Sequence, residues 1–309
     1  MQSLYAQVTA RALSPEGLTD PFPCDLGVKQ GCPLSPLLFG LYIDRVAPLI
    51  QAADPTAPAL AGLAIALLLY ADDLTLLSNT PEGLQNQLDA LHSFCLSSQL
   101  DVNLAKTEVV VFNPPCPSMS RSAAPPPPPT WHFGCSPVTI SDSYRYLGIV
   151  FHNTKGISTA PTHLHAAATR ALHALHTRCT ELRLTTPTIL CRLFDSLITP
   201  VLSYAAEIWA IAPGTSKPSS TIEHLHRRFL RRVAGMHPTC LNEAVYAEFG
   251  RTPLSFHHHR LAANFFTRVA ALPDDRPVKR ALIAALELDQ NSRQSRTGIS
   301  NLQHRLTEL

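Results

Sequence analysis

The hydrophobic positions follow two different patterns along the chain. Residues 55–71 (PTAPALAGLAIALLLYA) carry no charge, and residues 107–112 (TEVVVF) are rich in β-branched side chains. The first run favours a buried core element and the second a buried strand. After about residue 160, apolar side chains recur every three or four positions, which is the spacing of a buried helix face. In the first of these helices, near residues 162–184, they are Ala168, Leu172, Leu175, Cys179 and Leu182. The pattern predicts an α+β fold, with an α/β front part and an all-helical back part.

A hydroxyl residue followed by proline marks four expected helix starts. A Ser or Thr side chain at the N-cap accepts a hydrogen bond from a free backbone N–H, and proline suits the first helical position. The four residues are Ser35, Thr80, Thr186 and Thr252. Helices are expected near residues 36–50, 81–95, 187–211, 220–234, 240–249 and 253–272, and the second carries Leu84, Leu88, Leu91 and Cys95 on one face. Pro200 should kink or break its helix, and Gly235 and Gly250 should end theirs.

Two further segments lie between the front and the back part. Residues 125–129 are five consecutive prolines, which are typical of an extended loop or linker outside the core. Residues 138–151 (VTISDSYRYLGIVF) predict a strand pair, or one strand with a tight turn.

The composition is that of a chain with a packed core and no membrane anchor. Hydrophobic residues make up 45% of the 309 positions and charged residues 16%. The first residues contain no long apolar stretch, so no signal peptide is expected. Residues 55–71 contain Pro55, Pro58 and Gly62 and run into two aspartates, which favours a buried element over a membrane span. The eight cysteines show no C-x-x-C pair and no zinc spacing, which predicts reduced intracellular thiols.

Charge is distributed unevenly between the two parts. Residues 1–159 contain 7 Lys or Arg against 12 Asp or Glu, whereas residues 160–309 contain 18 against 11. A basic half favours a polyanionic partner such as a nucleic acid. A surface that is merely uneven remains the alternative on charge alone.

Asp72 and Asp73 stand side by side within the apolar run LLLYADDLTLL. Two carboxylates between two strand-like runs fit a β-hairpin with the charges at its tip. Carboxylate oxygens suit Mg²⁺, and a pair of Mg²⁺ ions holds the attacking and leaving oxygens in phosphoryl transfer. The alternative is a solvated hairpin turn.

A second motif, GVKQGCPLSPLLF, covers residues 27–39. Gly27 and Gly31 permit a close backbone approach to a ligand, and Gln30 between them offers a donor and an acceptor. Ser35 and Pro36 then begin a helix whose N-terminal amides favour anions. The alternative is an ordinary Gly- and Pro-containing loop that leads into a helix.

Together the two motifs resemble a reverse transcriptase of the non-LTR retrotransposon (LINE-like) type. Four further segments are similar to regions of that family: residues 100–112 (LDVNLAKTEVVVF), 144–151 (YRYLGIVF), 198–211 and 222–235. The resemblance covers residues 1 to about 285. It implies a partial polymerase palm, an antiparallel sheet with helices, over residues 1–114, and a Pro-rich linker over 115–130. A palm hairpin that grips the primer would follow at 131–158, and a helical thumb and C-terminal region at 159–309.

The resemblance also implies roles for single residues. Asp72 would be the metal ligand, with Asp73 as the secondary carboxylate, and Tyr70 would lie near the primer end. Gln30 and Gly31, with Gly27, would pack under the nucleotide and the template base. Lys106 would lie near the triphosphate, or would simply begin a strand. The residues of the primer hairpin would be Tyr146, Leu147 and Gly148.

The family would supply a third carboxylate and a nucleotide-binding region upstream of Gly27, and neither is visible in the 26 preceding residues. Losing one metal-bridging carboxylate should cost several kcal/mol of transition-state stabilisation, or several orders of magnitude in rate. The resemblance therefore implies a fragment of an RNA-directed DNA polymerase, and we expect it to be inactive alone, with weak or no Mg²⁺ binding. Two alternatives stay open: a noncatalytic nucleic-acid-binding module, and a piece completed by a separately encoded N-terminal segment. The partners implied by the family are an RNA template, a DNA primer and dNTPs.

The expected helix over residues 220–234 carries the strongest basic signal of the back part. Arg227, Arg228, Arg231 and Arg232 form two i,i+4 pairs, and Leu225, Phe229 and Val233 lie on the opposite side. An Arg stripe opposite an apolar stripe suits a helix that packs on a core and faces phosphates, or a merely solvated basic face. The histidines at 163, 165, 173, 176 and 257–259 show no metal spacing and are assigned to polar helix faces.

Overall fold

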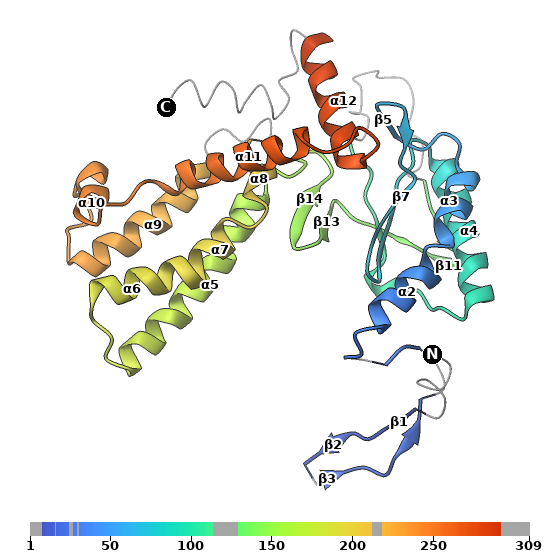
Figure 1. Cartoon of the computed structure of the whole chain (residues 1–309), viewed down its shortest axis with the longest axis horizontal. Coiled ribbons are helices and arrows are strands. Elements are labelled where there is room, and N and C mark those ends of the chain that lie inside the picture. Colours follow the sequence, from blue (N-terminus) through green and yellow to red (C-terminus); the bar gives the residue numbers. More distant parts are fainter. Residues whose placement is uncertain are drawn as a thin grey trace, which may run out of the picture. The chain divides into compact units, whose positions relative to one another are not determined.

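The structure is a computed structural model that describes residues 8–15, 17–24, 27–29, 31–113, 129–211 and 218–291. The chain forms two compact units (Figure 1). The first comprises Met1–Ala105 and Pro127–Val138, and the second Lys106–Pro126 and Thr139–Leu309.

In the ranges that the structure describes, the first unit combines three helices with short strand pairs. The helices are α2 (Ser35–Ile43), α3 (Val46–Ala53) and α4 (Pro81–Ser98). The paired strands are β1 (Thr9–Ala10) with β4 (Phe22–Pro23), β2 (Leu13–Ser14) with β3 (Gly17–Leu18), β5 (Ala59–Leu60) with β6 (Leu63–Ala64), β7 (Leu67–Tyr70) with β8 (Asp73–Leu76), and β10 (His132–Phe133) with β11 (Ser136–Pro137). All five pairs are antiparallel.

A small apolar core holds the first unit together. Helices α3 and α4 pack side by side, and the core lies between them and the β7–β8 pair (Figure 1). Its buried side chains are Val46, Ile50, Ala57, Ala66, Leu91, Phe94 and Cys95. Their spacing on α4, at i, i+3 and i+4, is the amphipathic pattern expected from the sequence.

The second unit is mainly helical, with two strand pairs at its start. Strand β9 (Glu108–Val109) pairs in parallel with β12 (Thr139–Ile140), and β13 (Ser143–Tyr146) pairs antiparallel with β14 (Ile149–His152). The helices are α5 (Ala160–Glu181), α6 (Pro187–Leu193), α7 (Thr199–Leu202), α8 (Ala206–Trp209), α9 (Pro218–Ala234), α10 (Asn242–Glu248), α11 (Leu254–Ala270) and α12 (Pro277–Asn291). A larger core lies among them and includes Phe194, Ile198, Leu202, Trp209, Ile222 and Leu230.

The α+β class predicted from the sequence is confirmed, but several element boundaries are wrong. The helix expected over residues 36–50 is two helices, α2 and α3. The strand expected over 107–112 is only β9, and Phe112 is 50% exposed. The helix expected over 187–211 divides into α6, a π-helical turn at Phe194–Ile198, α7 and α8. Pro200 stands in the first turn of α7, where a missing N–H costs nothing, so the break falls before it.

Of the four expected hydroxyl caps, one is confirmed. The side chain of Thr80 accepts a hydrogen bond from the Gly83 N–H at 3.0 Å at the start of α4. Thr186 occupies the N-cap of α6 without a side-chain capping bond. Ser35 lies inside α2, where its hydroxyl donates to the Lys29 carbonyl at 2.6 Å, and α11 begins after Pro253 rather than after Thr252. The predicted helix stops are confirmed, since Gly235 and Gly250 both have positive φ.

In the described ranges each sheet has two strands, so the larger antiparallel sheet of a polymerase palm stays a prediction. The apolar residues 55–71 form β5, β6 and β7. Only Ala57 and Ala66 among them are buried, so the expectation of a buried element is wrong for most of this run. None of the helices among the described residues is both long and apolar enough to cross a membrane. The five-proline run lies outside the described residues except for Pro129.

Candidate active site

The two aspartates lie at the tip of the β7–β8 hairpin. Leu67–Tyr70 pairs antiparallel with Asp73–Leu76, and Tyr70 stands directly opposite Asp73. The loop therefore consists of two residues, Ala71 and Asp72. The hairpin predicted from LLLYADDLTLL is confirmed.

The hairpin has one apolar and one mixed face because side chains alternate along a strand. Leu67, Leu69, Leu74 and Leu76 pack against the core of the first unit. The other face carries the pairs Leu68 with Thr75 and Tyr70 with Asp73. Tyr70 is 61% exposed, so an aromatic ring and a carboxylate stand together on an accessible surface.

Ala71 has a left-handed backbone with φ of 53°. For a residue with a Cβ, this conformation raises the free energy by about 1–2 kcal/mol, a strain that glycine would not have. The strain is local to the loop that places Asp72. The sequence offered no signal for it, because alanine is a poor marker of a left-handed turn.

Both carboxylates are exposed to solvent. Water can therefore solvate their charges, and neither needs a cationic partner to be stable there. Two adjacent oxygen donors on a tight turn fit a hard cation such as Mg²⁺, which keeps several of its waters. Among the described residues there is no group of three or more His, Cys, Asp or Glu side chains that could hold a metal. Asp72 and Asp73 are thus a partial ligand set.

The Gly27 to Gly31 turn precedes α2. Gly27 and Gly31 have φ of 86° and 81°, which only glycine adopts without strain. The Ser35 hydroxyl donates to the Lys29 carbonyl and ties the turn to the helix start. Gln30 lies outside the described residues.

Lys106 ends a short 3₁₀ turn, Leu104–Lys106, and is exposed. It belongs to the second unit, whereas Asp72 and Asp73 belong to the first.

The Tyr146–Leu147–Gly148 segment forms the turn of the β13–β14 hairpin. Tyr146 pairs with Ile149, and both loop residues have positive φ, which is the usual geometry of a two-residue hairpin loop. Tyr204, which follows α7, donates its hydroxyl to the Leu147 carbonyl at 2.6 Å. A Cβ at Gly148 would lie 3.2 Å from the Tyr204 ring. Tyr204 was not recognised in the sequence, because it is 56 residues away from the turn that it contacts.

Helix α9 buries its apolar stripe as predicted, since Leu225 and Phe229 are nearly inaccessible. Its arginines differ in environment. Arg228 and Arg232 are exposed, whereas Arg231 donates to the Cys240 carbonyl and to the Asn242 side chain, each at 2.8 Å. Arg227 is partly buried beside Tyr246. The solvent-facing row on α9 is therefore His224, Arg228 and Arg232 at i, i+4 and i+8.

Helix α5 packs against α9 and adds histidines to this row. Burial and the neighbouring His224 lower the pKa of His165. Burial, Arg232 and His173 lower the pKa of His176. In the described part of α5 and α9 the acidic side chains are Glu181, which pairs with Arg178 at 2.7 Å, and the buried Glu223. We call the surface formed by the half-buried His165 and His176 and the exposed His173, His224, Arg228 and Arg232 the basic face.

The assignment of the histidines 257–259 to a polar helix face is wrong for His258. Its side chain is 2% exposed, and its Nε2 lies 3.1 Å from the Ser203 hydroxyl. Burial, reinforced by His257, lowers the pKa of His258 to about 4. The residue is a neutral core histidine whose partner comes from the segment after α7.

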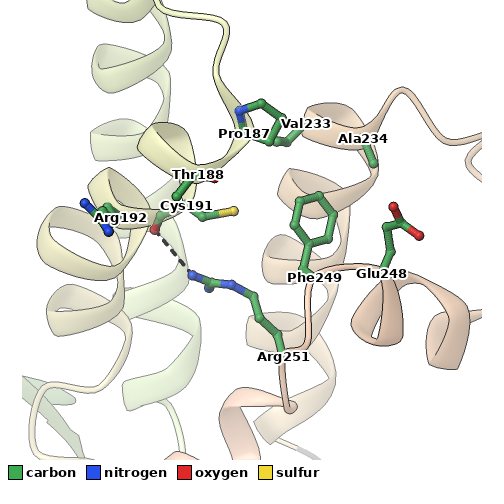
Figure 2. Close-up of a pocket in the computed structure, with 9 residues that line it drawn as sticks. All are labelled: Pro187, Thr188, Cys191, Arg192, Val233, Ala234, Glu248, Phe249 and Arg251. Carbon is green, nitrogen blue, oxygen red and sulfur yellow. Dashed lines mark hydrogen bonds between the residues drawn. The ribbon is translucent and has the colours of Figure 1, made fainter.

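A pocket of about 650 Å³ lies between α6, α9 and α10 (Figure 2). Arg251 donates to the Cys191 carbonyl at 3.4 Å and binds both oxygens of Asp195, which ties the residues after α10 to α6 and the following turn. Burial raises the pKa of the Cys191 thiol, so it is a poor nucleophile. The pocket offers no pair of groups for acid–base or metal chemistry.

Comparison with known proteins relates the first half of the chain to reverse transcriptases. Residues 1–151 match the family model for reverse transcriptase (RNA-dependent DNA polymerase). The chain is 32% identical over 130 residues to a retrovirus-related Pol polyprotein from the type-1 retrotransposable element R2 of Nasonia vitripennis. It is 34% identical over 140 residues to a Pol polyprotein from the type-2 element R2DM of Drosophila melanogaster, and 28% over 131 residues to a type-1 R2 Pol polyprotein of Popillia japonica.

These matches cover 41%, 44% and 41% of this chain but only 12%, 13% and 21% of the three relatives. The chain thus corresponds to a small part of each relative. The residues matched by the family model include both the Gly27–Gly31 turn and the Asp72–Asp73 hairpin. On these findings, residues 1–151 are a reverse transcriptase domain of the non-LTR retrotransposon (LINE-like) type, related to those of R2 elements.

Proposed function

We propose that this chain contributes Asp72 and Asp73 to the metal centre of an RNA-directed DNA polymerase. The observation that carries the proposal is the two-residue hairpin loop that presents both carboxylates on an exposed tip. Further ligands come from a polymerase segment outside the described residues. The chain alone is then a poor catalyst.

Two carboxylates at the tip would hold Mg²⁺, which supplies charge stabilisation for nucleotidyl transfer. Asp72 lies in the loop and Asp73 on the open face beside Tyr70, so the two side chains can present oxygens to one region. The tyrosine ring beside Asp73 offers a surface on which a sugar or base can rest. The apolar face keeps the tip in place while its polar face meets substrate.

The other predicted residues take supporting roles in this proposal. The Gly27–Gly31 turn, with Gln30, packs against the nucleotide and the template base. Lys106 neutralises triphosphate charge. The primer strand rests on the hairpin turn at Tyr146, Leu147 and Gly148.

Metal binding tests the proposal directly. Mn²⁺, followed by electron paramagnetic resonance, should bind weakly to the wild-type chain and more weakly to Asp72→Asn and Asp73→Asn. Asp44→Asn is the matched control, because Asp44 is an exposed aspartate of the same unit. Equal Mn²⁺ affinity in all four proteins would contradict the proposal.

A primer-extension assay of polymerase activity provides a second test of the proposal. With Mg²⁺, dNTPs and an RNA template annealed to a DNA primer, we expect background extension from the chain alone. Extension should appear when an N-terminal reverse transcriptase segment is co-expressed, and Asp72→Asn should reduce it by about 10²-fold or more. Robust extension by the chain alone would show that its metal site is complete.

A second candidate function, nucleic-acid binding without catalysis, is favoured by the basic face. Three exposed cationic or titratable residues follow one row of α9, and three histidines of α5 lie beside them. Such a surface binds phosphates with a strong salt dependence. The pKa values of His165 and His176 are lowered, so protonation of these two side chains should add charge and tighten binding only as the pH falls below about 6.5.

The test is duplex affinity as a function of salt. The double variant Arg228→Gln, Arg232→Gln should weaken binding to a primer–template duplex and reduce the salt slope by about two. The double variant Arg260→Gln, Arg268→Gln, at two exposed arginines of α11, is the control with the same charge loss elsewhere. No measurable binding at low salt would exclude this function.

A further inference from the structure

A buried polar cluster lies at the base of the β7–β8 hairpin, at the end opposite the carboxylate tip. Asp54, which follows α3, is 2% exposed, and Gln87 of α4 is fully buried. Gln87 Nε2 donates to Asp54 Oδ2 at 3.0 Å and to the Leu77 carbonyl, the residue after β8, at 2.9 Å. One side-chain amide thus connects helix α4, the end of α3 and the hairpin.

The orientation of this amide is dictated by its neighbours. A carboxylate and a carbonyl can only accept, so the NH₂ group of Gln87 must face both of them. Its Oε1 has no hydrogen-bond partner among the described residues. Leaving a buried amide oxygen without a hydrogen bond costs free energy. Gln87 keeps this orientation in spite of that cost, which indicates that its two donated hydrogen bonds stabilise the unit.

Asp54 is fixed as a carboxylate by several donors. The Thr56 N–H and hydroxyl donate to Oδ1 at 2.9 and 2.7 Å, and Gln87 donates to Oδ2. Burial alone would raise the pKa of Asp54, but the hydrogen bonds from Ser78, Thr56 and Gln87 hold it below its usual value. The charge is therefore retained inside the unit.

The space around the cluster is closed. A Cβ at Gly83 would lie 2.6 Å from both Asp54 Oδ2 and the Ser78 hydroxyl. The Asn79 side chain donates to the Thr56 carbonyl at 3.0 Å, and the Leu77 N–H donates to the Ala66 carbonyl at 2.8 Å. These hydrogen bonds hold both strands of the hairpin at its base, where the strands join the rest of the unit.

We propose that Gln87 and Asp54 are positioning residues that fix the β7–β8 hairpin, and through it the carboxylates at its tip. The inference rests on the proposed metal-binding function of that tip. Four residues per strand span about 13 Å, so a small tilt at the base moves Asp72 and Asp73 appreciably. Since productive placement tolerates errors of only about 0.5 Å, a loosened base should weaken the metal site without unfolding the unit.

Hydrogen–deuterium exchange tests the structural part. Gln87→Met keeps the length of the side chain and removes both donated bonds. We expect the amides of residues 67–77 to exchange about tenfold faster or more. The control is Gln85→Met on the same helix, since Gln85 instead binds the backbone of His132 at 2.9 Å through both its amide oxygen and nitrogen.

A second pair of variants, with a smaller structural change, keeps the test informative if Gln87→Met does not fold. Thr56→Ala removes one donor to Asp54, whereas Thr56→Ser retains the hydroxyl and should restore wild-type exchange. Mn²⁺ affinity should fall with Gln87→Met and Thr56→Ala and stay at the wild-type value with Gln85→Met and Thr56→Ser.

The possible outcomes distinguish the metal-binding function of the hairpin tip from the positioning role of Gln87 and Asp54. If the wild-type chain binds no Mn²⁺, the metal function fails, while the exchange data still decide whether the base fixes the hairpin. Unchanged exchange over residues 67–77 in both Gln87→Met and Thr56→Ala would overturn the inference. Equal effects of Gln85→Met and Gln87→Met would overturn it as well.

Discussion

The Tyr246 hydroxyl donates a hydrogen bond to Glu223 Oε2 at 2.6 Å, deep in the helical unit. The other carboxylate oxygen of Glu223 accepts from the Ser255 N–H at 2.7 Å, at the start of α11. One buried carboxylate of α9 therefore connects α10 and α11. Burial alone would raise the pKa of Glu223, but the His226 imidazole, 3.9 Å away, and the hydrogen bonds from Tyr246 and Ser255 hold it below its usual value.

This relationship predicts that Glu223→Gln destabilises the second unit. The amide has the same shape, but one of its ends cannot accept a hydrogen bond, so a buried donor loses its partner. We expect a loss of about 1–3 kcal/mol in the free energy of unfolding, measured by urea denaturation. Glu181→Gln, which breaks only the exposed pair with Arg178, should change it by less than about 1 kcal/mol.

Acid should weaken the same unit through His258. Its pKa is about 4 in the folded chain, against about 6.5 when exposed, so the unfolded state binds the proton first. The stability is complete above pH 6.5 and falls as the pH is lowered towards 4, by about 3 kcal/mol at 1.36 kcal/mol per pKa unit. The lowered pKa of Glu223 extends the loss at still lower pH, as that carboxylate is protonated.

Denaturation curves at pH 7, 6 and 5 measure this effect. His258→Gln removes the titrating group and should flatten the change between pH 6.5 and 5. An unaltered slope in His258→Gln would mean that other groups cause the acid sensitivity.

Tyr204→Phe should loosen the β13–β14 hairpin. The variant removes the bond to the Leu147 carbonyl but keeps the ring against Gly148. A single hydrogen bond contributes about 0.5–1.5 kcal/mol, so amides of residues 143–152 should exchange up to about tenfold faster. Tyr144→Phe, an exposed position of the same hairpin, should leave exchange unchanged.

Ala71→Gly should stabilise the β7–β8 hairpin by about 0.5–1 kcal/mol. Glycine relieves the left-handed strain at φ of 53°, and the greater freedom of glycine in the unfolded chain offsets part of the gain. Ala90→Gly, inside α4, should instead destabilise the unit by about 1 kcal/mol. Thermal unfolding of both variants compares the two, and a loss in Ala71→Gly would show that the loop is not strained.

Thr80→Ala should lower stability by about 1 kcal/mol, because it removes the capping bond to the Gly83 N–H. Thr186→Ala removes an N-cap side chain that makes no such bond and should have a much smaller effect. Equal losses in the two variants would mean that the Thr80 bond contributes little.

Local patterns in the sequence predicted the elements best. The apolar runs on both sides of Asp72 and Asp73 predicted the hairpin. The spacing of Leu84, Leu88, Leu91 and Cys95 predicted the apolar face of α4, of which all but Leu84 are buried. Boundaries were less predictable where two local signals competed. Val111 and Phe112 have high strand propensity, yet only Glu108–Val109 pairs, because pairing depends on a partner strand.

The sequence by itself determined where the carboxylates lie, since a hairpin loop and its alternating strands are properties of neighbouring residues. It also determined the helical nature of the back half and the apolar stripe of α9. Only the tertiary structure decided which polar groups are buried and paired. Asp54 meets Gln87 across 33 positions, and His258 meets Ser203 across 55. Burial of such groups depends on what distant segments bring to them, and the desolvation of a charge is compensated only when those segments supply the donors.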